Sequence, residues 1–102
     1  MEVKKKILLV SATIGKNYEL AQELKEIIDN TTAVDTAVIN LESYDLPLYK
    51  PGIETKNETA SELSAEFKNA DGFVFCAPEY NGGLPPILTN AFTWISVTTA
   101  NW

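Results

Sequence analysis

The stretch that decides the fold of this chain runs Phe73-Val74-Phe75-Cys76-Ala77-Pro78-Glu79-Tyr80-Asn81-Gly82-Gly83-Leu84-Pro85-Pro86. Its first five residues are apolar without polar alternation, a pattern typical of a strand that is buried on both faces of a parallel sheet. Pro78 ends the strand because it cannot donate a ladder hydrogen bond, and the two glycines allow a sharp turn or a close approach to a flat ligand. The proline pair suits the start of an apolar helix over residues 87–95. A strand, a glycine-containing loop and a helix start together indicate a ligand-binding corner.

The composition fits one small domain and argues against several classes of function. The chain has 102 residues, of which 45% are hydrophobic and 22% charged, and this balance indicates a globular, soluble protein. A net charge of −6 and the lack of a basic stripe disfavour nucleic-acid binding. No apolar run reaches the roughly 20 residues of a membrane helix. The apolar segment after the N-terminal lysines is too short for a signal peptide, so we expect a cytoplasmic location and no membrane partner.

The residue types that carry most side-chain chemistry are scarce. Histidine is absent, which removes the Ser-His and Cys-His nucleophile systems and the commonest general base and metal ligand. The single cysteine, Cys76, excludes an internal disulfide and multi-cysteine metal motifs, and its position within a strand predicts buried packing. We therefore predict no metal site and no catalytic side chain, so an enzyme with this sequence would need a cofactor to carry the chemistry.

The rest of the chain alternates strands and helices. We expect strands at residues 6–10, 33–40 and 73–77, and helices at residues 17–29, 60–69 and 87–95. One face of the first helix is apolar: Leu20, Ala21, Leu24, Ile27 and Ile28. Thr59, with Glu62 three residues later, is the expected N-cap of the second helix. Residues 41–58 contain two prolines and one glycine, which predicts an irregular loop of a length that is often functional.

This βαβαβα order predicts an α/β fold with a parallel sheet and helices on both faces. Right-handed crossovers leave few topologies, and the flavodoxin-like strand order 2-1-3 fits, with the second strand and its Asp35 at an edge. In such a sheet, ligands bind beyond the carboxyl ends of the first and third strands. The loops at those positions are residues 11–17 and 78–84, which also carry the chemistry best suited to a ligand.

The first of these loops has the features of an anion site. Ser11 and Thr13 supply hydroxyl groups, and Gly15 lets backbone N–H groups converge. Lys16 and Asn17 follow at a helix N-terminus, whose positive dipole favours a phosphate. The loop matches neither the P-loop nor the dinucleotide fingerprint, which favours a mononucleotide or a flavin phosphate. An ordinary helix-capping loop is the alternative interpretation.

The second loop carries a carboxylate, an aromatic ring and an amide. Tyr80 can cover an aromatic ligand, and Asn81 can hydrogen-bond the edge of a heterocycle. Glu79 is either a local cap or a solvated carboxylate, and it lacks the second carboxylate that a paired acid–base role would need. A purely structural turn is again the alternative.

Three segments resemble the family of NAD(P)H-dependent FMN reductases, a flavodoxin-like group that includes quinone, azo-dye and chromate reductases. Residues 70–85 are similar to the family's Pro-Glu-Tyr-Asn signature, residues 88–94 to its L-K-N-A-x-D-W segment, and residues 45–49 to its D-L-P-L-Y loop. The resemblance covers nearly the whole chain in the right order. It implies bound FMN, NADPH or NADH as the reductant, a small-molecule electron acceptor, and a homo-oligomer that is a dimer or tetramer.

The resemblance also implies which residues hold the flavin. Ser11, Thr13 and Asn17 would take the FMN phosphate. Five residues of the second loop would line the isoalloxazine ring: Pro78, Glu79, Tyr80, Asn81 and Gly82. The first loop departs from the family pattern G-S-x-R-x-x-S-x-N-x-x-L-A, because it is shorter and lacks the arginine. Lys16 is the candidate to replace the lost charge, and the sequence does not choose between NADH and NADPH.

We predict one flavodoxin-like domain over residues 1–102 that is incomplete at its carboxyl end. Family members continue through two more strands and helices, and without them residues 73–77 would form an exposed apolar sheet edge, which natural proteins avoid. We therefore expect a continuing chain or another copy of the chain to cover that edge. The leading function is an FMN-dependent NAD(P)H oxidoreductase, or a piece of one. The alternatives are a non-enzymatic electron carrier or redox sensor of the same fold, and a truncated domain that binds no flavin.

Overall fold

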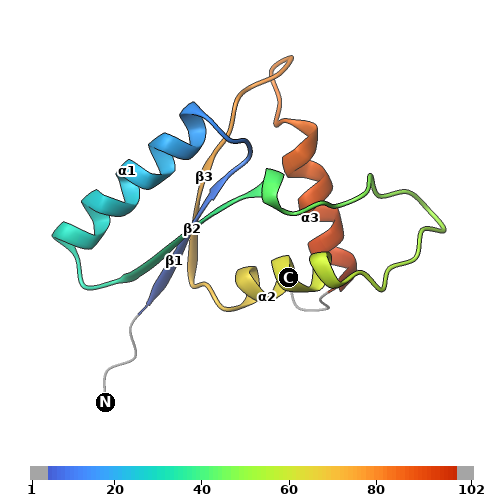
Figure 1. The fold of residues 1–102 in the computed structure, drawn as a ribbon, viewed down its shortest axis with the longest axis horizontal. Helices are drawn as coiled ribbons and strands as arrows, with labels where there is room; N and C mark the ends of the chain where they lie inside the picture. The colour runs from blue at the N-terminus through green and yellow to red at the C-terminus, as the bar shows by residue number, and fades with distance from the viewer. Residues whose placement is uncertain (1–4, 99–102) are drawn as a thin grey trace.

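The structure is a computed structural model, and it describes residues 5–98 of the chain. Three parallel strands form one sheet: β1 (Lys6–Ser11), β2 (Asp35–Asn40) and β3 (Gly72–Cys76). Their order is β2-β1-β3, which confirms the predicted topology (Figure 1). At the end of β1, Ser11 lies between Asn40 of β2 and Cys76 of β3. The carboxyl ends of all three strands therefore meet at one edge of the sheet.

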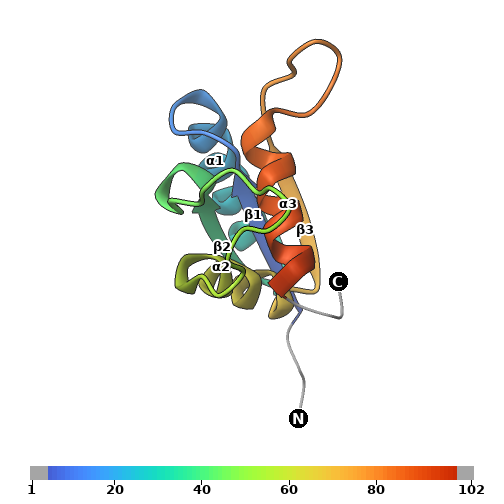
Figure 2. The ribbon, with the colours of Figure 1, turned by 90° about the vertical axis from the view of Figure 1, so that its right-hand side faces the viewer.

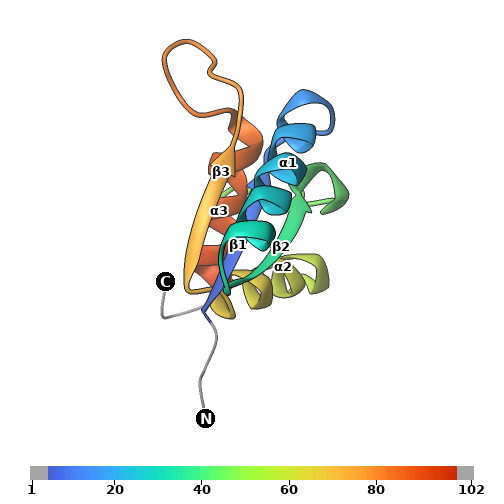
Figure 3. The same cartoon turned by 90° about the vertical axis from the view of Figure 1, so that its left-hand side faces the viewer.

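Helices cover both faces of this sheet, as the alternating element order predicts. One face carries α1 (Lys16–Thr31), and the other carries α2 (Glu58–Lys68) and α3 (Pro86–Thr98), as Figures 2 and 3 show from opposite sides. A single turn of 3₁₀ helix, η1 (Leu41–Ser43), follows β2 and opens the long loop to α2. No helix within residues 5–98 is both long enough and apolar enough to cross a membrane.

The central strand is buried on both faces because successive side chains of a strand point to opposite sides. Leu8 and Val10 face α2 and α3, whereas Leu9 faces Ala21 of α1. All four side chains are fully buried. Cys76 is also buried in the layer below α1, which confirms its predicted role in packing.

The predicted apolar face of α1 is wider than the face that the helix buries. Ala21 is buried and Ile28 packs against the sheet, but Leu20 is 46% exposed and Ile27 is 58% exposed. Leu20 and Ile27 are seven residues apart and so share one side of the helix. Each directly precedes a residue that faces the sheet, Ala21 or Ile28, and therefore points about 100° away from it around the helix axis. Leu24 packs against the same cluster as Ala21 and Ile28, so the sheet contacts the side of α1 that these three residues form.

The N-cap of α2 is Asn57, so the prediction of Thr59 was wrong. The Oδ1 atom of Asn57 accepts a hydrogen bond of 2.9 Å from the N–H of Ala60, and the helix begins at Glu58. Asparagine caps helices at least as well as threonine. The earlier start also places the Glu58 carboxylate in the first turn, where the positive end of the helix dipole stabilises it.

Candidate functional site

The two predicted ligand loops leave the sheet side by side. Residues 12–15 connect β1 to α1, and residues 77–85 connect β3 to α3. A hydrogen bond of 2.9 Å from the N–H of Ala12 to the carbonyl of Cys76 joins their starting points. Figure 1 shows both loops at the same end of the molecule, with the loop after β3 projecting farther. The structure therefore brings both sets of predicted site residues to the carboxyl edge of the sheet.

The first loop ends in a helix N-terminus that no side chain caps. Gly15 is the N-cap of α1, and no side-chain hydrogen bond closes this end of the 16-residue helix. Its φ of 111° lies in the region that favours glycine. No atom lies within 4 Å of the position that a Cβ of Gly15 would occupy, so the space beside the backbone is open. Uncapped N–H groups, the helix dipole and open space together suit a bound anion.

The predicted phosphate ligands of this loop differ in accessibility. Ser11 is fully buried, and its Oγ donates a 2.5 Å hydrogen bond to the carbonyl of Thr13, so this hydroxyl shapes the loop. Thr13 and Asn17 are half-buried, and Lys16 is exposed. In this conformation Thr13, Lys16 and Asn17 are accessible to a ligand, whereas Ser11 supports the loop from inside.

The second loop is built around a tight turn. The N–H of Tyr80 donates to the carbonyl of Gly83 at 3.1 Å, and the N–H of Gly83 donates to the carbonyl of Tyr80 at 2.9 Å. Between them, Asn81 has φ 52° and Gly82 has φ 76°. Two consecutive positive φ angles are typical of a type I′ turn, for which Asn-Gly is the preferred dipeptide. The Asn81-Gly82 dipeptide is the signal in the sequence for this turn, whereas the prediction of a sharp turn rested on the two glycines.

The turn exposes the residues that were predicted to line a flat ligand. Tyr80 is 54% exposed. Glu79, Asn81 and Gly82 are also exposed, and Pro78 is half-buried at the base of the loop. The two hydrogen bonds fix the backbone of the turn, so residues 79–82 are exposed in a defined arrangement beyond the end of β3.

Sequence reasoning missed how α3 holds the long loop after β2. The Asn90 side chain accepts a hydrogen bond from the N–H of Tyr49 at 2.8 Å and donates to the carbonyl of Pro47 at 3.1 Å. The indole Nε1 of Trp94 donates to the same carbonyl at 2.7 Å, and its ring meets that of Tyr49 edge to face at 5.5 Å. Asn90 and Trp94 are four residues apart and so lie on one helix face. They hold residues 47–49 against α3.

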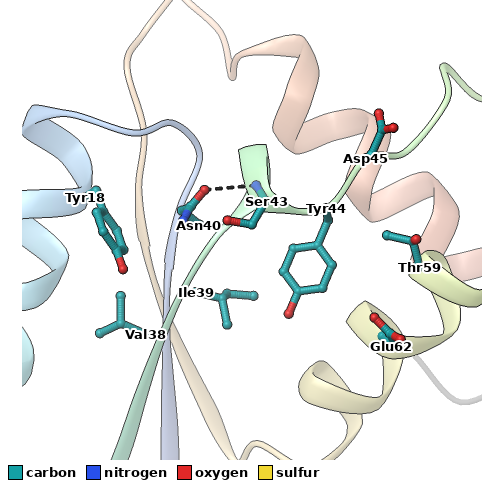
Figure 4. Close-up of a pocket in the computed structure, with 9 residues that line it drawn as sticks. All are labelled: Tyr18, Val38, Ile39, Asn40, Ser43, Tyr44, Asp45, Thr59 and Glu62. Atoms are coloured by element: carbon teal, nitrogen blue, oxygen red, sulfur yellow. Dashed lines mark hydrogen bonds between the residues drawn. The ribbon is translucent and has the colours of Figure 1, made fainter.

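A cavity of about 500 Å³ opens on the β2 side of the first loop, and the sequence did not predict it (Figure 4). It is lined by residues from α1, β2, the segment after β2 and α2: Tyr18, Val38, Ile39, Asn40, Ser43, Tyr44, Asp45, Thr59 and Glu62. Partial burial, and then the nearby carboxylates of Glu66 and Glu62, raise the pKa of the Tyr44 phenol. The walls of the cavity thus carry aromatic rings within a negative potential.

The strand order and the helix-covered faces define a flavodoxin-like α/β protein. The solved structure of FerB, a flavoenzyme NAD(P)H:(acceptor) oxidoreductase from Paracoccus denitrificans, superimposes with a TM-score of 0.71. The match covers 88% of this chain and 50% of that chain at 21% sequence identity, so it bears on the fold alone.

The family follows from the sequence comparison. The family described as NADPH-dependent FMN reductase matches residues 5–102, and this chain belongs to it. Membership confirms the predicted family and agrees with the predicted cofactor class, FMN with a reduced nicotinamide as electron donor.

Two curated relatives are reductases of quinones by name. The chain is 34% identical to a quinone reductase of Pseudomonas putida over 77 residues, which are 74% of this chain and 39% of the relative. It is 31% identical to a 2-hydroxy-1,4-benzoquinone reductase of a Burkholderia species over 81 residues, which are 78% of this chain and 42% of the relative. The chain therefore spans about two fifths of the length of these relatives.

Proposed function

We propose that this chain is the flavin-binding part of an FMN-dependent NAD(P)H oxidoreductase that passes electrons to a small acceptor such as a quinone. The observation that carries the proposal is the pairing of the uncapped α1 N-terminus with the Tyr80–Gly83 turn at one edge of the sheet. Family membership and the names of the quinone reductase relatives support the reaction class. The cytoplasm is the location that we expect from the sequence.

The α1 N-terminus would hold the FMN phosphate. Its first-turn N–H groups and the helix dipole attract the anion, and the side chains of Thr13 and Asn17 can add hydrogen bonds. The chain contains no arginine, so Lys16 supplies the positive charge of this loop. The helix dipole and hydroxyl groups would be the main partners of the phosphate. The phosphate would therefore contribute less free energy of binding here than in a site built around arginine.

The turn after β3 would hold the flavin ring. The exposed Tyr80 ring offers an aromatic surface, and Asn81 offers amide groups to the polar edge of the ring system. FMN supplies the redox chemistry when bound, taking a hydride from the reduced nicotinamide and delivering electrons to the acceptor. The protein binds and orients the flavin, and the absence of histidine is compatible with this division of labour.

A titration of FMN with the chain, followed by quenching of flavin fluorescence, tests the proposal. The chain should quench FMN fluorescence saturably, and Tyr80→Ala and Thr13→Ala should each bind FMN more weakly. Lys16→Gln should reduce the ratio of the affinity for FMN to the affinity for riboflavin. Lys68→Gln, which removes an exposed lysine at the end of α2, is the control and should have no effect. If neither this chain nor a longer protein that contains it quenches FMN, the flavin assignment is refuted.

We also propose that another strand covers the outer edge of β3 in the assembled protein, from the same polypeptide or from a second copy in a homo-oligomer. Within residues 5–98, β3 pairs with β1 alone, and Phe75 is left 39% exposed. Open edges of this kind invite strand pairing. Light scattering gives the oligomeric state, and hydrogen exchange reports on the amides of residues 73–77. A strict monomer of this chain with slowly exchanging amides there would contradict the proposal.

A further inference from the structure

The cavity on the β2 side lies along the open edge of the sheet. Within residues 5–98, β2 pairs with β1 alone, so no strand covers its outer side. Val38 packs against the core cluster below α1 and Ile39 against the cluster on the opposite face, yet both residues line the cavity. Figure 4 shows Tyr18 and Tyr44 on either side of these two residues. The cavity therefore wraps around the edge of β2, with one aromatic ring from each side.

The charged side chains of the cavity are all acidic. Asp45 and Glu62 are the charged residues of its lining, and both are exposed. Glu66 follows one turn later on α2, and after the larger effect of burial its carboxylate and that of Glu62 raise the pKa of Tyr44. The Nζ atom of Lys6 lies 4.0 Å from Glu66 in a half-exposed pair, which offsets only part of this charge. The cavity therefore attracts cations and repels anions.

An organic cation fits this lining better than a metal ion. Residues 5–98 contain no group of three or more side chains that could hold a metal, and a hard cation such as Ca²⁺ takes six or more oxygen ligands. The two tyrosine rings can contact a carbon skeleton, and the face of such a ring attracts an ammonium group. The hydroxyl groups of Ser43 and Thr59 join the carboxylates as hydrogen-bond acceptors. The volume of about 500 Å³ falls within the range of small-molecule sites.

We propose that this cavity binds a small organic amine in its protonated, ammonium form, in preference to a neutral or anionic molecule of similar shape. The ammonium group would lie near Asp45 and Glu62, with its carbon skeleton against the tyrosine rings and the apolar side chains of β2. The inference goes beyond the proposed flavin function and does not depend on it, because no residue that we assign to FMN lines the cavity.

Three phenyl compounds of similar shape and different charge test the proposal: phenethylammonium, the neutral 2-phenylethanol, and the anion phenylacetate. Each compound is titrated into the isotope-labelled chain at neutral pH and constant ionic strength, and the amide chemical shifts give both the dissociation constant and the place of binding. We expect phenethylammonium to bind at least about fivefold more tightly than 2-phenylethanol, and phenylacetate to bind most weakly. The shifts should centre on residues 38–45 and 59–62, which include most of the lining.

Variants separate the local carboxylates and the aromatic ring from the net charge of the chain. Asp45→Asn/Glu62→Gln should lower the preference for the ammonium over the alcohol to less than about twofold. Glu23→Gln/Glu26→Gln removes the same number of charges from exposed positions of α1 outside the cavity and should keep the wild-type preference. Tyr44→Phe retains a ring and should also keep the preference, whereas Tyr44→Leu should reduce it. Circular dichroism confirms that each variant is folded.

Several results would overturn the proposal. They are equal binding of the three compounds, shifts centred outside the cavity, a carboxylate double variant with the preference of the wild type, or no saturation by phenethylammonium up to about 10 mM. The FMN titration gives a separate answer. Binding of FMN without binding of the ammonium would refute this inference and leave the flavin function intact. Binding of the ammonium without FMN would support the cavity and count against the flavin site.

Discussion

Replacing Asn90 with alanine should loosen the contact between α3 and the loop after β2. The change removes the acceptor of the Tyr49 N–H, a partly buried bond of 2.8 Å, and one of two donors to the Pro47 carbonyl. An unpaired buried N–H costs about 1–3 kcal/mol. The carbonyl keeps its 2.7 Å bond from Trp94, so the second loss adds little. We expect the free energy of unfolding to fall by about 2 kcal/mol.

Urea denaturation followed by circular dichroism measures this change. Thr93→Ala is the matched control, because Thr93 lies on the same helix and its hydroxyl bonds only the carbonyl of Thr89 within α3, at 3.0 Å. The control should change stability by less than about 0.5 kcal/mol. A loss in Asn90→Ala no larger than that in the control would refute the reasoning.

A double-mutant cycle with Trp94→Phe isolates the shared carbonyl. Each single variant leaves Pro47 one donor, whereas the double variant removes both. We therefore expect Trp94→Phe to cost more in the Asn90→Ala background than in the wild type, by about 0.5–1 kcal/mol. Strict additivity would show that the two side chains stabilise the loop independently.

Other predictions concern glycine geometry and alkaline pH. Gly82→Ala should cost about 1 kcal/mol in urea denaturation because φ is 76°, whereas Gly72→Ala should stay within about 0.5 kcal/mol, since its added Cβ would meet only an ordinary contact at 4.0 Å. Burial, followed by Glu66 and Glu62, raises the folded pKa of Tyr44 above its usual 10.0, so stability should fall as pH rises above about 10. Tyr44→Phe should remove that part of the fall, and absorbance at alkaline pH should show one tyrosine titrating late. Burial likewise raises the pKa of Cys76 above 9.0, so its thiol should react slowly with a disulfide reagent at pH 8 until urea unfolds the chain.

The sheet could be predicted because its strands carry a strong pattern. Residues 7–10 and 73–77 are continuous apolar runs, and the two helical segments between them leave few ways to connect parallel strands. The start of α2 could not be fixed in the same way. Asn57 and Thr59 are both good capping residues two positions apart, and only the path of the folded loop decides between them.

The candidate site was predictable to different degrees. The carboxyl edge followed from topology alone, and Asn81-Gly82 carried the signal for the turn. The burial of Ser11 could not be predicted. The sequence does not show whether a loop serine points to solvent or, like Ser11, hydrogen-bonds a backbone carbonyl of its own loop. The cavity lined by Tyr18 and Glu62 was also out of reach, since four separate elements assemble it and spacing along the chain does not place them relative to one another.

The hydrogen bond from Ala12 to Cys76 bears on how far apart the two site loops begin. It ties together the points where the two loops leave β1 and β3, which are neighbouring strands. Neighbouring strands stand about 4.8 Å apart, and that spacing is a rigid property of the sheet rather than of the loops. The starting points of the two loops are therefore held at a fixed separation by the sheet, whereas the loops themselves set how far the α1 N-terminus and the turn lie from those points. The two loops can adjust to a ligand only beyond Ala12 and Cys76, and a change in the distance between their starting points would require β1 and β3 to separate.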